Sequence, residues 1–335
     1  MNIIAATAEL HEIKSGFCRV KLYLRSVKMK IFIDGKAGTT GLRIYERLAS
    51  RDDVELIVLD DEKRKDTACR KQALNSADVA FLCLPDAAAE EAVALIDNPD
   101  TVVIDTSTAH RTADGWAYGF PELSAAHEAK IASSGRIAVP GCHASGFIAL
   151  VYPLIEAGAL KPDALLTCFS LTGYSGGGKK MIAEYEESTS PLLKAPRQYA
   201  LGQTHKHLKE MAGITGLASY PAFCPTVDDF YSGMEVTVPI FSQQVGGLTK
   251  EEIADIYRKK YTGDIVSVRD ASDEGGVLSA AALSGKDSMK IAVYGNDERM
   301  LLTAVYDNLG KGASGAALEC LNIVSNKAKS YGLDI

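Results

Sequence analysis

Cys142 is the side chain of this sequence best placed to act as a nucleophile. It directly follows Pro140-Gly141, where a strand is expected to end, and the apolar run 147–155 predicts a helix that begins at the thiol. The positive end of a helix dipole favours a thiolate, so we expect a lowered pKa and a reactive sulfur near neutral pH. Five other cysteines lie in apolar or strand-like surroundings and are expected to be packing residues: Cys69, Cys83, Cys168, Cys224 and Cys320.

A thiol nucleophile needs an acid/base partner, and histidine is the side chain that titrates near neutral pH. In the segment 204–210, His207 lies three residues before Glu210, so both can share one helix face with the carboxylate fixing the imidazole tautomer. We favour His207 as the base and keep His205 as the alternative. His143 is a weaker candidate, because neighbouring side chains at a helix start point in different directions. Two histidines two residues apart make a poor zinc pattern, and no metal is expected.

A glycine-rich turn indicates a second chemistry, the binding of a pyrophosphate. Gly35, Gly38 and Gly41 form a GxxGxxG pattern, with Thr39 and Thr40 between the last two glycines. The turn follows an apolar strand and opens a helix, whose first N–H groups can bind phosphate oxygens. This context predicts a dinucleotide site.

The residues that would contact the ribose give a mixed signal. Asp60 follows the second predicted strand and could accept a hydrogen bond from a 2′-hydroxyl, as in NAD enzymes. Lys63 or Arg64 could instead bind the 2′-phosphate of NADP. The pattern alone leaves both cofactors open.

Short apolar runs alternate with amphipathic segments before Cys142, which predicts a doubly wound α/β sheet. The expected strands are 30–34, 54–59, 78–84 and 101–105, and the expected helices are 40–50, 66–74 and 87–96. After Cys142 the pattern predicts an α+β domain with a mixed sheet. Its expected strands are 164–171, 234–240, 290–294 and 300–306, with helices over 249–261 and 307–329.

Composition narrows the class of protein. The chain has 335 residues, is 47% hydrophobic and carries a formal net charge of −7, which disfavours nucleic acid and anionic membranes as partners. Seven cysteines without a CxxC pair suit reduced thiols in a cytoplasmic protein. Residues 1–28 lack a signal-peptide pattern, and we expect them to form a poorly ordered extension before Met29.

Four motifs in this order resemble the short form of the N-acetyl-gamma-glutamyl-phosphate reductase family, within the aspartate-semialdehyde dehydrogenase-like group. They are the GxxGxxG turn, Pro140-Gly-Cys-His-Ala-Ser-Gly146, Thr204-His-Lys-His207 and Asp307-Asn-Leu-Gly-Lys-Gly-Ala-Ser-Gly315. The resemblance covers residues 29–335. It implies NADPH as cofactor, an acyl-phosphate substrate, a thioester intermediate and a place in arginine biosynthesis.

The resemblance also implies a fold and a domain division. It indicates a Rossmann-type nucleotide domain joined to an α+β catalytic and dimerisation domain of the glyceraldehyde-phosphate dehydrogenase-like type. The nucleotide domain would comprise 29–142 and 307–335, because the resemblance places the last helix against it, and the catalytic domain would comprise 143–306. The family's large sheet implies a homodimer or homotetramer.

Residue roles follow by matching motifs. Cys142 would be the nucleophile, with His205, His207 and Glu210 in the acid/base segment. Substrate phosphate or phosphate ion would meet Arg111 and Ser145. The cofactor would lie beside Ser107, Ser175, Gly176, Gly177 and Asn308. Ala144, Ser145 and Lys209 stand where the longer family form carries Pro, Thr and Pro, which leaves the phosphate donors and the choice of histidine open.

Rival functions of three classes remain. An aspartate-semialdehyde dehydrogenase or an N-acetyl-aminoadipyl-phosphate reductase would use the same nucleophile, although the tail motif and the His-Lys-His segment favour the glutamyl enzyme. A non-catalytic dinucleotide-binding redox sensor would not need an acid/base pair. A cysteine hydrolase would not explain the GxxGxxG turn.

Overall fold

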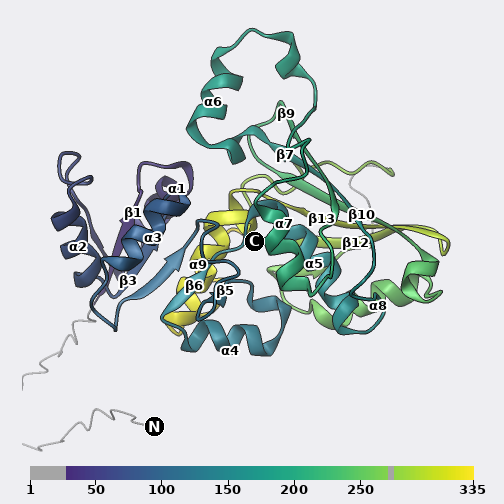
Figure 1. The fold of residues 1–335 in the computed structure, drawn as a ribbon, viewed down its shortest axis with the longest axis horizontal. Helices are drawn as coiled ribbons and strands as arrows, with labels where there is room; N and C mark the ends of the chain where they lie inside the picture. Colours follow the sequence, from purple (N-terminus) through teal and green to yellow (C-terminus); the bar gives the residue numbers. More distant parts are fainter. Residues whose placement is uncertain (1–27, 271–274) are drawn as a thin grey trace, which may run out of the picture.

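Parallel strands build the first half of the chain in the computed structural model, which describes residues 28–270 and 275–335 (Figure 1). Six strands pair in the order β2-β1-β3-β4-β6-β5, all parallel. They are β1 (Met29–Asp34), β2 (Val54–Ile57), β3 (Val79–Leu82), β4 (Val102–Asp105), β5 (Ala117–Tyr118) and β6 (Arg136–Ala138). The expected extension 1–28 lies, apart from Lys28, outside the described residues.

Helices cover both faces of this sheet, as its continuous apolar strands predict. Ile31 and Ile33 of β1 pack in one core, while Phe32 between them packs in another on the opposite face. The covering helices are α1 (Thr39–Ala49), α2 (Thr67–Ser76), α3 (Asp86–Ala94) and α4 (Ala125–Ser133). The α/β class predicted from the sequence is therefore confirmed.

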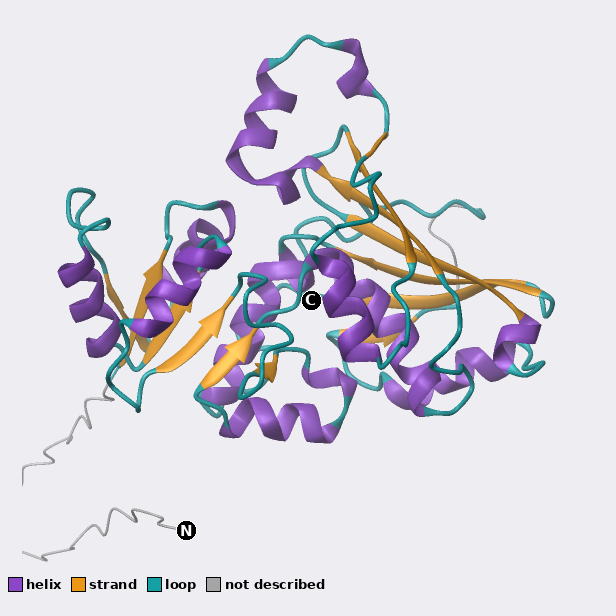
Figure 2. Cartoon of the chain, viewed as in Figure 1, coloured by secondary structure: helices purple, strands orange, loops and turns teal. Residues whose placement is uncertain are grey.

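The second half of the chain forms a mixed sheet that stands beside the first (Figure 2). Its order is β11-β12-β13-β10-β7-β9-β8. The strands are β7 (Thr167–Gly173), β8 (Arg197–Gln198), β9 (Ala222–Asp228), β10 (Met234–Phe241), β11 (Val266–Val268), β12 (Met289–Gly295) and β13 (Arg299–Tyr306). Its helices are α5 (Cys142–Glu156), α6 (Gly178–Glu187), α7 (His207–Thr215) and α8 (Lys250–Lys260). Helix α5 packs its apolar side chains against this sheet in the largest core.

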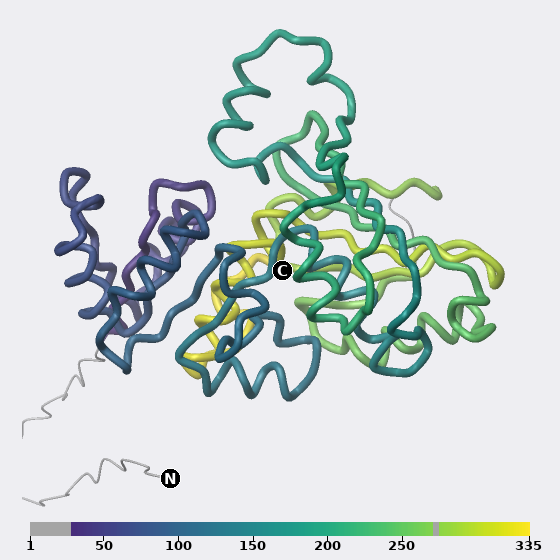
Figure 3. Tube along the Cα trace, in the orientation of Figure 1, coloured from purple at the N-terminus to yellow at the C-terminus, as the bar shows by residue number. Residues whose placement is uncertain are grey.

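The chain returns to the first sheet after β13, as the trace in Figure 3 shows. The predicted helix over 307–329 is wrong in its length. A π-helical turn, Gly310–Ser314, precedes a shorter helix α9, Gly315–Val324. The turn is crowded against neighbouring segments, since a Cβ on Gly310 would overlap the carbonyl of Lys286. Helix α9 shares a core with β1, β3 and β4 of the first sheet.

A buried ion group anchors this π-helical turn. Lys311 is 2% exposed, and its Nζ lies 2.8 Å from both carboxylate oxygens of Glu122 and in contact with Glu319. Burial raises the pKa of Glu319 to about 8. The turn next to Lys311 brings Gly312 against Cys142, so this ion group helps to fix one wall of the thiol's surroundings. No helix among the described residues has the length and apolar character that crossing a membrane requires.

We expect Lys311→Met to lower the free energy of unfolding by about 3 to 5 kcal/mol, because it leaves a buried carboxylate without its cation. Urea unfolding followed by circular dichroism measures the loss. Lys327→Met is the matched control: its Nζ lies 3.9 Å from Asp53 and its side chain is 43% exposed. That control should cost under about 1 kcal/mol. Equal losses in the two variants would contradict a structural role for the buried group.

Candidate active site

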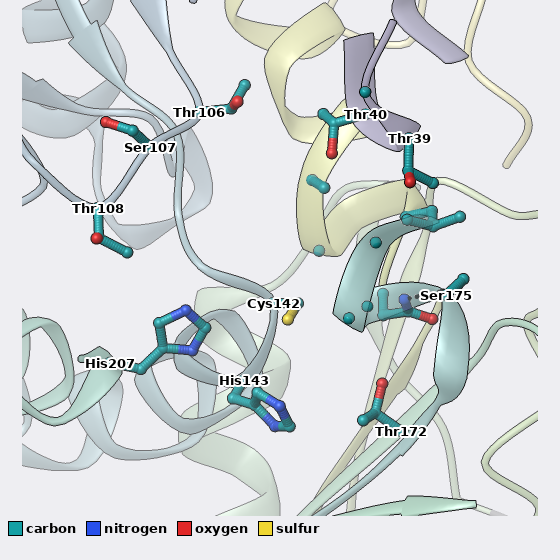
Figure 4. A pocket seen from close by; sticks show the side chains of 18 of the residues that line it. Thr39, Thr40, Thr106, Ser107, Thr108, Cys142, His143, Thr172, Ser175 and His207 are labelled. Atoms are coloured by element: carbon teal, nitrogen blue, oxygen red, sulfur yellow. Dashed lines mark hydrogen bonds between the residues drawn. The ribbon is translucent and has the colours of Figure 1, made fainter. Parts of the chain in front are cut away.

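A cavity of about 430 Å³ collects most of the predicted site residues from both halves of the chain. Figure 4 shows Cys142, His207, Ser107 and Ser175 around it, with Thr39 and Thr40 at one side. The predicted residues that line it are Gly38, Thr39, Thr40, Gly41, Ser107, Arg111, Cys142, Ser175, Gly176, Gly177, His205, His207 and Asn308. Three predicted residues do not line it: Gly35, Ser145 and Glu210.

Cys142 begins α5, as predicted, and glycines allow other segments to approach it closely. Gly141 is the N-cap of the helix, and a Cβ there would overlap the guanidinium of Arg111 and lie 2.5 Å from Nε2 of His207. A Cβ on Gly312 would lie 3.1 Å from the Cβ of Cys142. Two positions without side chains thus bring the thiol beside an imidazole, a guanidinium and the π-helical turn.

The carboxylate of Glu210 holds the backbone just before the thiol. Its Oε1 accepts hydrogen bonds from the N–H of Gly141 at 2.8 Å and from the hydroxyl of Tyr118 at 2.7 Å. Its Oε2 accepts from Nη1 of Arg111 at 3.0 Å. Glu210 is only 2% exposed, so both of its oxygens are satisfied by protein donors in a buried setting.

This network corrects the predicted role of Glu210. We expected the carboxylate to fix the tautomer of His207 from three residues away on α7. Instead its hydrogen bonds go to Gly141, Tyr118 and Arg111, and Nδ1 of His207 is buried without a partner. The shared helix face brings the two residues close, but the carboxylate points at the cysteine's approach segment.

Three histidines cluster beside the thiol. The ring centroids of His205 and His207 are 4.7 Å apart, and His143 lies 5.7 Å from each. His143 contacts Ser170 Oγ through Nδ1 and Tyr199 Oη through Nε2, both at 2.6 Å. With both ring nitrogens occupied, His143 is a poor proton acceptor for another group, as its weaker ranking from the sequence anticipated.

Burial controls the protonation of the thiol and the imidazole. It raises the pKa of Cys142, with Arg111 and the N–H of His143 opposing the shift, so the predicted lowering is wrong for this structure. Burial also lowers the pKa of His207 well below its usual value, and the charge of Arg111 adds to that effect. The resting pair is therefore a neutral thiol beside a neutral imidazole, because desolvation penalises both charged forms.

Arg111 has its guanidinium held from three sides. Its Nε donates to the carbonyl of Val139 and its Nη2 to that of Thr106, in addition to the bond to Glu210. A guanidinium has five N–H donors. These three contacts use three of them, so two remain. Arg111 lines the cavity, so those two donors are available to an anion there.

Two predicted serines have different surroundings. Ser107 lines the cavity, and its hydroxyl donates to the buried carboxylate of Asp105 at 2.7 Å. Ser145 is 1% exposed, and its hydroxyl donates to the carbonyl of Gly141 at 3.1 Å. That internal bond and its absence from the cavity lining argue against the predicted phosphate contact of Ser145.

The GxxGxxG turn fits a pyrophosphate group. Gly35 has a φ of +86°, and a Cβ on Gly41 would lie 2.6 Å from the carbonyl of Gly35, so the turn closes only without side chains. It delivers the N-terminus of α1 to the cavity, and the hydroxyl of Thr39 there is buried without a partner. An orphaned donor beside a helix start is what an anionic ligand would satisfy.

Ser175 and Asn308, which follow strands β7 and β13 of the second sheet, meet beside the same cavity. Nδ2 of Asn308 donates to Oγ of Ser175 at 3.0 Å, and its Oδ1 accepts from the N–H of Gly233 at 2.9 Å. Both side chains are about 1% exposed. The contacts fix the start of α6 next to the turn that leads into α9.

A second cavity, of about 600 Å³, adjoins the other side of the glycine turn. Its walls include Gly35, Tyr45 and the end of β2, and its basic residues include Arg64. Asp60 and Lys63, the two other predicted ribose contacts, do not line it. Of the three predicted ribose contacts, only Arg64 therefore lines this cavity, together with the neighbouring Lys65 and Asp61.

Sequence reasoning missed two tyrosines at the site. Tyr118 lies on a two-residue strand and donates to Glu210, and Tyr199 follows the equally short β8 and contacts His143. Strands this short leave no periodic pattern to detect. No motif marked either residue.

Family models match both halves of the chain. Residues 30–131 match the semialdehyde dehydrogenase NAD-binding domain, and residues 142–308 match the semialdehyde dehydrogenase dimerisation domain. The fold and the cysteine site thus define a dehydrogenase of the semialdehyde class, and the second match indicates an oligomer.

Curated relatives narrow the family. The chain is 44% identical to N-acetyl-gamma-glutamyl-phosphate reductase 2 of Nostoc sp., over 91% of this chain and 99% of that protein. It is 41% identical to N-acetyl-gamma-glutamyl-phosphate reductase 2 of Pseudomonas putida, over 90% and 98%. The chain belongs to the N-acetyl-gamma-glutamyl-phosphate reductase family, as its motifs predicted.

Solved structures share the fold at low sequence identity. Aspartate semialdehyde dehydrogenase II from Vibrio cholerae matches with a TM-score of 0.68 and 17% identity, over 90% of this chain and 99% of that one. Aspartate semialdehyde dehydrogenase from Candida albicans matches with a TM-score of 0.64 and 15% identity, over 91% and 99%. The glyceraldehyde-phosphate dehydrogenase-like two-domain architecture predicted above agrees with this shared fold.

We expect His143 to make the protein sensitive to acid. Burial lowers its pKa to about 3, whereas in the unfolded chain it titrates near 6.5, so protons bind the unfolded state first as the pH falls. Between pH 7 and pH 5 this one group should cost about 2 kcal/mol of unfolding free energy. Urea unfolding at pH 7 and at pH 5 measures the free energy of unfolding that is lost between them. That loss should be smaller by this amount in His143→Gln than in the wild type.

His127→Gln serves as the control for that titration. His127 is half-buried, and its pKa is lowered less than that of His143. The variant should keep most of the wild-type pH dependence. An unchanged pH dependence in His143→Gln would show that the buried imidazole does not carry the effect.

Proposed function

We propose that this protein reduces N-acetyl-L-glutamyl 5-phosphate to N-acetyl-L-glutamate 5-semialdehyde with NADPH, releasing phosphate, through a thioester on Cys142. The observation that carries the proposal is the shared cavity. The thiol, the imidazole of His207, the guanidinium of Arg111 and the glycine turn of α1 all line it. The names of the curated relatives support the choice of substrate.

Acylation begins with the thiol of Cys142 and the neutral imidazole of His207. Because burial keeps both groups uncharged, His207 accepts the thiol proton as the sulfur attacks the acyl carbon. The N–H groups in the first turn of α5 would stabilise the acyl oxygen, where negative charge develops. The bond between the acyl carbon and the bridging phosphate oxygen breaks, and the two unused N–H groups of Arg111 stabilise the departing phosphate.

Reduction follows at the same carbon. Bound NADPH supplies the hydride that reduces the thioester. The protonated His207 returns its proton to the sulfur as the tetrahedral adduct collapses, which regenerates the Cys142 thiol and releases the aldehyde. Ser175, Asn308 and Ser107 line the cavity and would contact the dinucleotide when it is bound.

The cofactor preference rests on Arg64. It lines the cavity beside the glycine turn together with Lys65 and Asp61, and its Nη1 lies 3.5 Å from Oδ1 of Asp61. Two cations and one carboxylate leave a net positive charge where the ribose of a dinucleotide would be. The residue that would favour an unphosphorylated ribose, Asp60, does not line this cavity, and its side chain is 81% exposed. We therefore propose NADP(H) rather than NAD(H).

The cellular setting completes the proposal. We propose that the enzyme acts in the cytoplasm, in arginine biosynthesis, as a homodimer or homotetramer. One face of the second sheet supports self-association. Phe169, Pro239 and Leu301 lie on it: Pro239 is in register with Leu301, Phe169 is in register with Thr237, and Phe169 and Leu301 are more than 40% exposed.

The reaction is tested in its reverse direction. Phosphate-dependent reduction of NADP with N-acetyl-glutamate semialdehyde should be seen in the wild type and lost in Cys142→Ser, which should still bind the dinucleotide. Aspartate semialdehyde, run in parallel, should be a poor substrate. Preference for the aspartyl compound would overturn the substrate, and turnover by Cys142→Ser would overturn the covalent mechanism.

The two histidines are distinguished by matched substitutions. His207→Asn should lower kcat by about 10² to 10⁴ with little change in KM, because it removes the proton acceptor. His205→Asn, which removes a neighbouring ring, should have a much smaller effect. If His205→Asn is the more damaging change, the acid/base role belongs to His205.

Arg64→Ala should raise KM for NADPH by about 10- to 100-fold, because it removes a charge-assisted contact with the 2′-phosphate. KM for NADH should change little. Lys63→Ala is the control, because Lys63 precedes Arg64 and carries the same charge but does not line the cavity. Equal effects in both variants, or equal effects on both cofactors, would assign the preference elsewhere.

A further inference from the structure

Tyr306 makes a contact that the mechanism above does not use. It is the last residue of β13, is fully buried and lies directly before the Asp307-Asn308 turn. Its hydroxyl donates a hydrogen bond to the carbonyl oxygen of Cys142 and accepts one from the N–H of Gly146 at 3.0 Å. A side chain from the second sheet therefore reaches into the first turn of α5.

The two backbone groups that Tyr306 bridges are four residues apart. In a regular α-helix the N–H of residue 146 donates to the carbonyl of residue 142. The Tyr306 hydroxyl therefore contacts both groups of the backbone pair that begins at Cys142. Gly146 is needed for this contact, because a Cβ at that position would lie 2.7 Å from the phenolic oxygen of Tyr306. The glycine leaves the space that the hydroxyl occupies.

The carbonyl of Cys142 belongs to the same peptide unit as the N–H of His143. That N–H acts to lower the pKa of Cys142, against the larger effect of burial. A donor on the carbonyl polarises the peptide and strengthens its N–H as a donor, because linked hydrogen bonds reinforce one another. Tyr306 is thus connected to the thiol through a single peptide unit.

We infer that Tyr306 is a positioning residue that holds the first turn of α5 and aims the His143 N–H at the Cys142 sulfur. It touches neither substrate nor cofactor and acts through the helix start. The inference rests on the proposed role of Cys142 as nucleophile. It explains why a buried tyrosine immediately precedes the turn that carries Asn308 and Gly312.

The same helix supplies a matched control. Tyr257 of α8 is also fully buried, and its hydroxyl donates to the carbonyl of Leu150 at 2.7 Å. Both tyrosines hydrogen-bond a backbone carbonyl of α5, but Leu150 lies two turns beyond Cys142. Loss of either hydroxyl should cost similar stability, whereas only the Tyr306 hydroxyl is linked to the thiol.

The experiment measures thiol reactivity directly and needs no substrate. Iodoacetamide alkylation of Cys142 is followed between pH 6 and pH 10 by mass spectrometry of its peptide, with Cys69 on α2 as the internal reference. Tyr306→Phe should slow alkylation of Cys142 at pH 8 by about 3- to 10-fold and move its pH midpoint upward. Tyr257→Phe should leave both unchanged, and kcat should fall only in Tyr306→Phe, with KM for NADPH preserved.

A second substitution keeps the hydroxyl and reverses the expected sign. Replacement of Tyr306 by 3-fluorotyrosine gives a more acidic phenol and a stronger donor to the Cys142 carbonyl. The pH midpoint of Cys142 alkylation should then move downward. This variant decides the question if Tyr306→Phe does not fold.

Each outcome has one meaning. Equal alkylation in wild type, Tyr306→Phe and the fluorotyrosine protein, or an equal effect of Tyr257→Phe, would overturn the inference and leave the proposed function standing. Turnover by Cys142→Ser would remove the proposed function instead, because the thiol that Tyr306 positions would then not be the nucleophile.

Discussion

The buried carboxylate of Glu210 is the contact on which the arrangement of the site depends. A carboxylate that is 2% exposed must have its oxygens satisfied, and the available donors come from three different segments: the N–H of Gly141, the hydroxyl of Tyr118 and the guanidinium of Arg111. Satisfying one side chain on α7 therefore fixes the approach to Cys142, a strand at the sheet edge and the candidate phosphate ligand relative to one another. Removing Arg111 would leave Oε2 of this buried carboxylate without its hydrogen-bond donor.

Close approach is the second constraint, and it explains where the glycines lie. Gly141 passes beside Arg111 and His207, Gly146 admits the hydroxyl of Tyr306, and Gly312 packs on Cys142. Each position faces a different element, so the start of α5 is enclosed by the nucleotide-binding half, the second sheet and the π-helical turn together. Side chains on rigid elements, rather than a loop, set the orientation of the thiol.

The sequence predicts features that depend on local pattern. Continuous apolar runs located β1 to β4 of the first sheet, and the Pro-Gly before Cys142 located the start of α5, because both signals lie within a few residues of the element they mark. It does not predict β8, Tyr118 or the π-helical turn, since a two-residue strand has no period and the turn depends on Lys311 meeting Glu122 across the fold. The partner of Glu210 was misjudged for the same reason. Spacing on α7 placed it near His207, but the donors that satisfy it come from segments distant in sequence.

The thiol shows how burial can outweigh a helix dipole. A dipole at a surface helix start contributes about 0.3 to 1 kcal/mol, whereas taking a charged group out of water costs several kcal/mol. Burial accordingly raises the pKa of Cys142 and lowers that of His207, and both shifts favour the neutral pair. A neutral pair transfers its proton only as the sulfur attacks, so the rate depends on how well the sulfur, the imidazole and the helix-start N–H groups are aligned. The contacts that hold those three groups, from Glu210 on one side and Tyr306 on the other, are therefore part of the chemistry as much as of the fold.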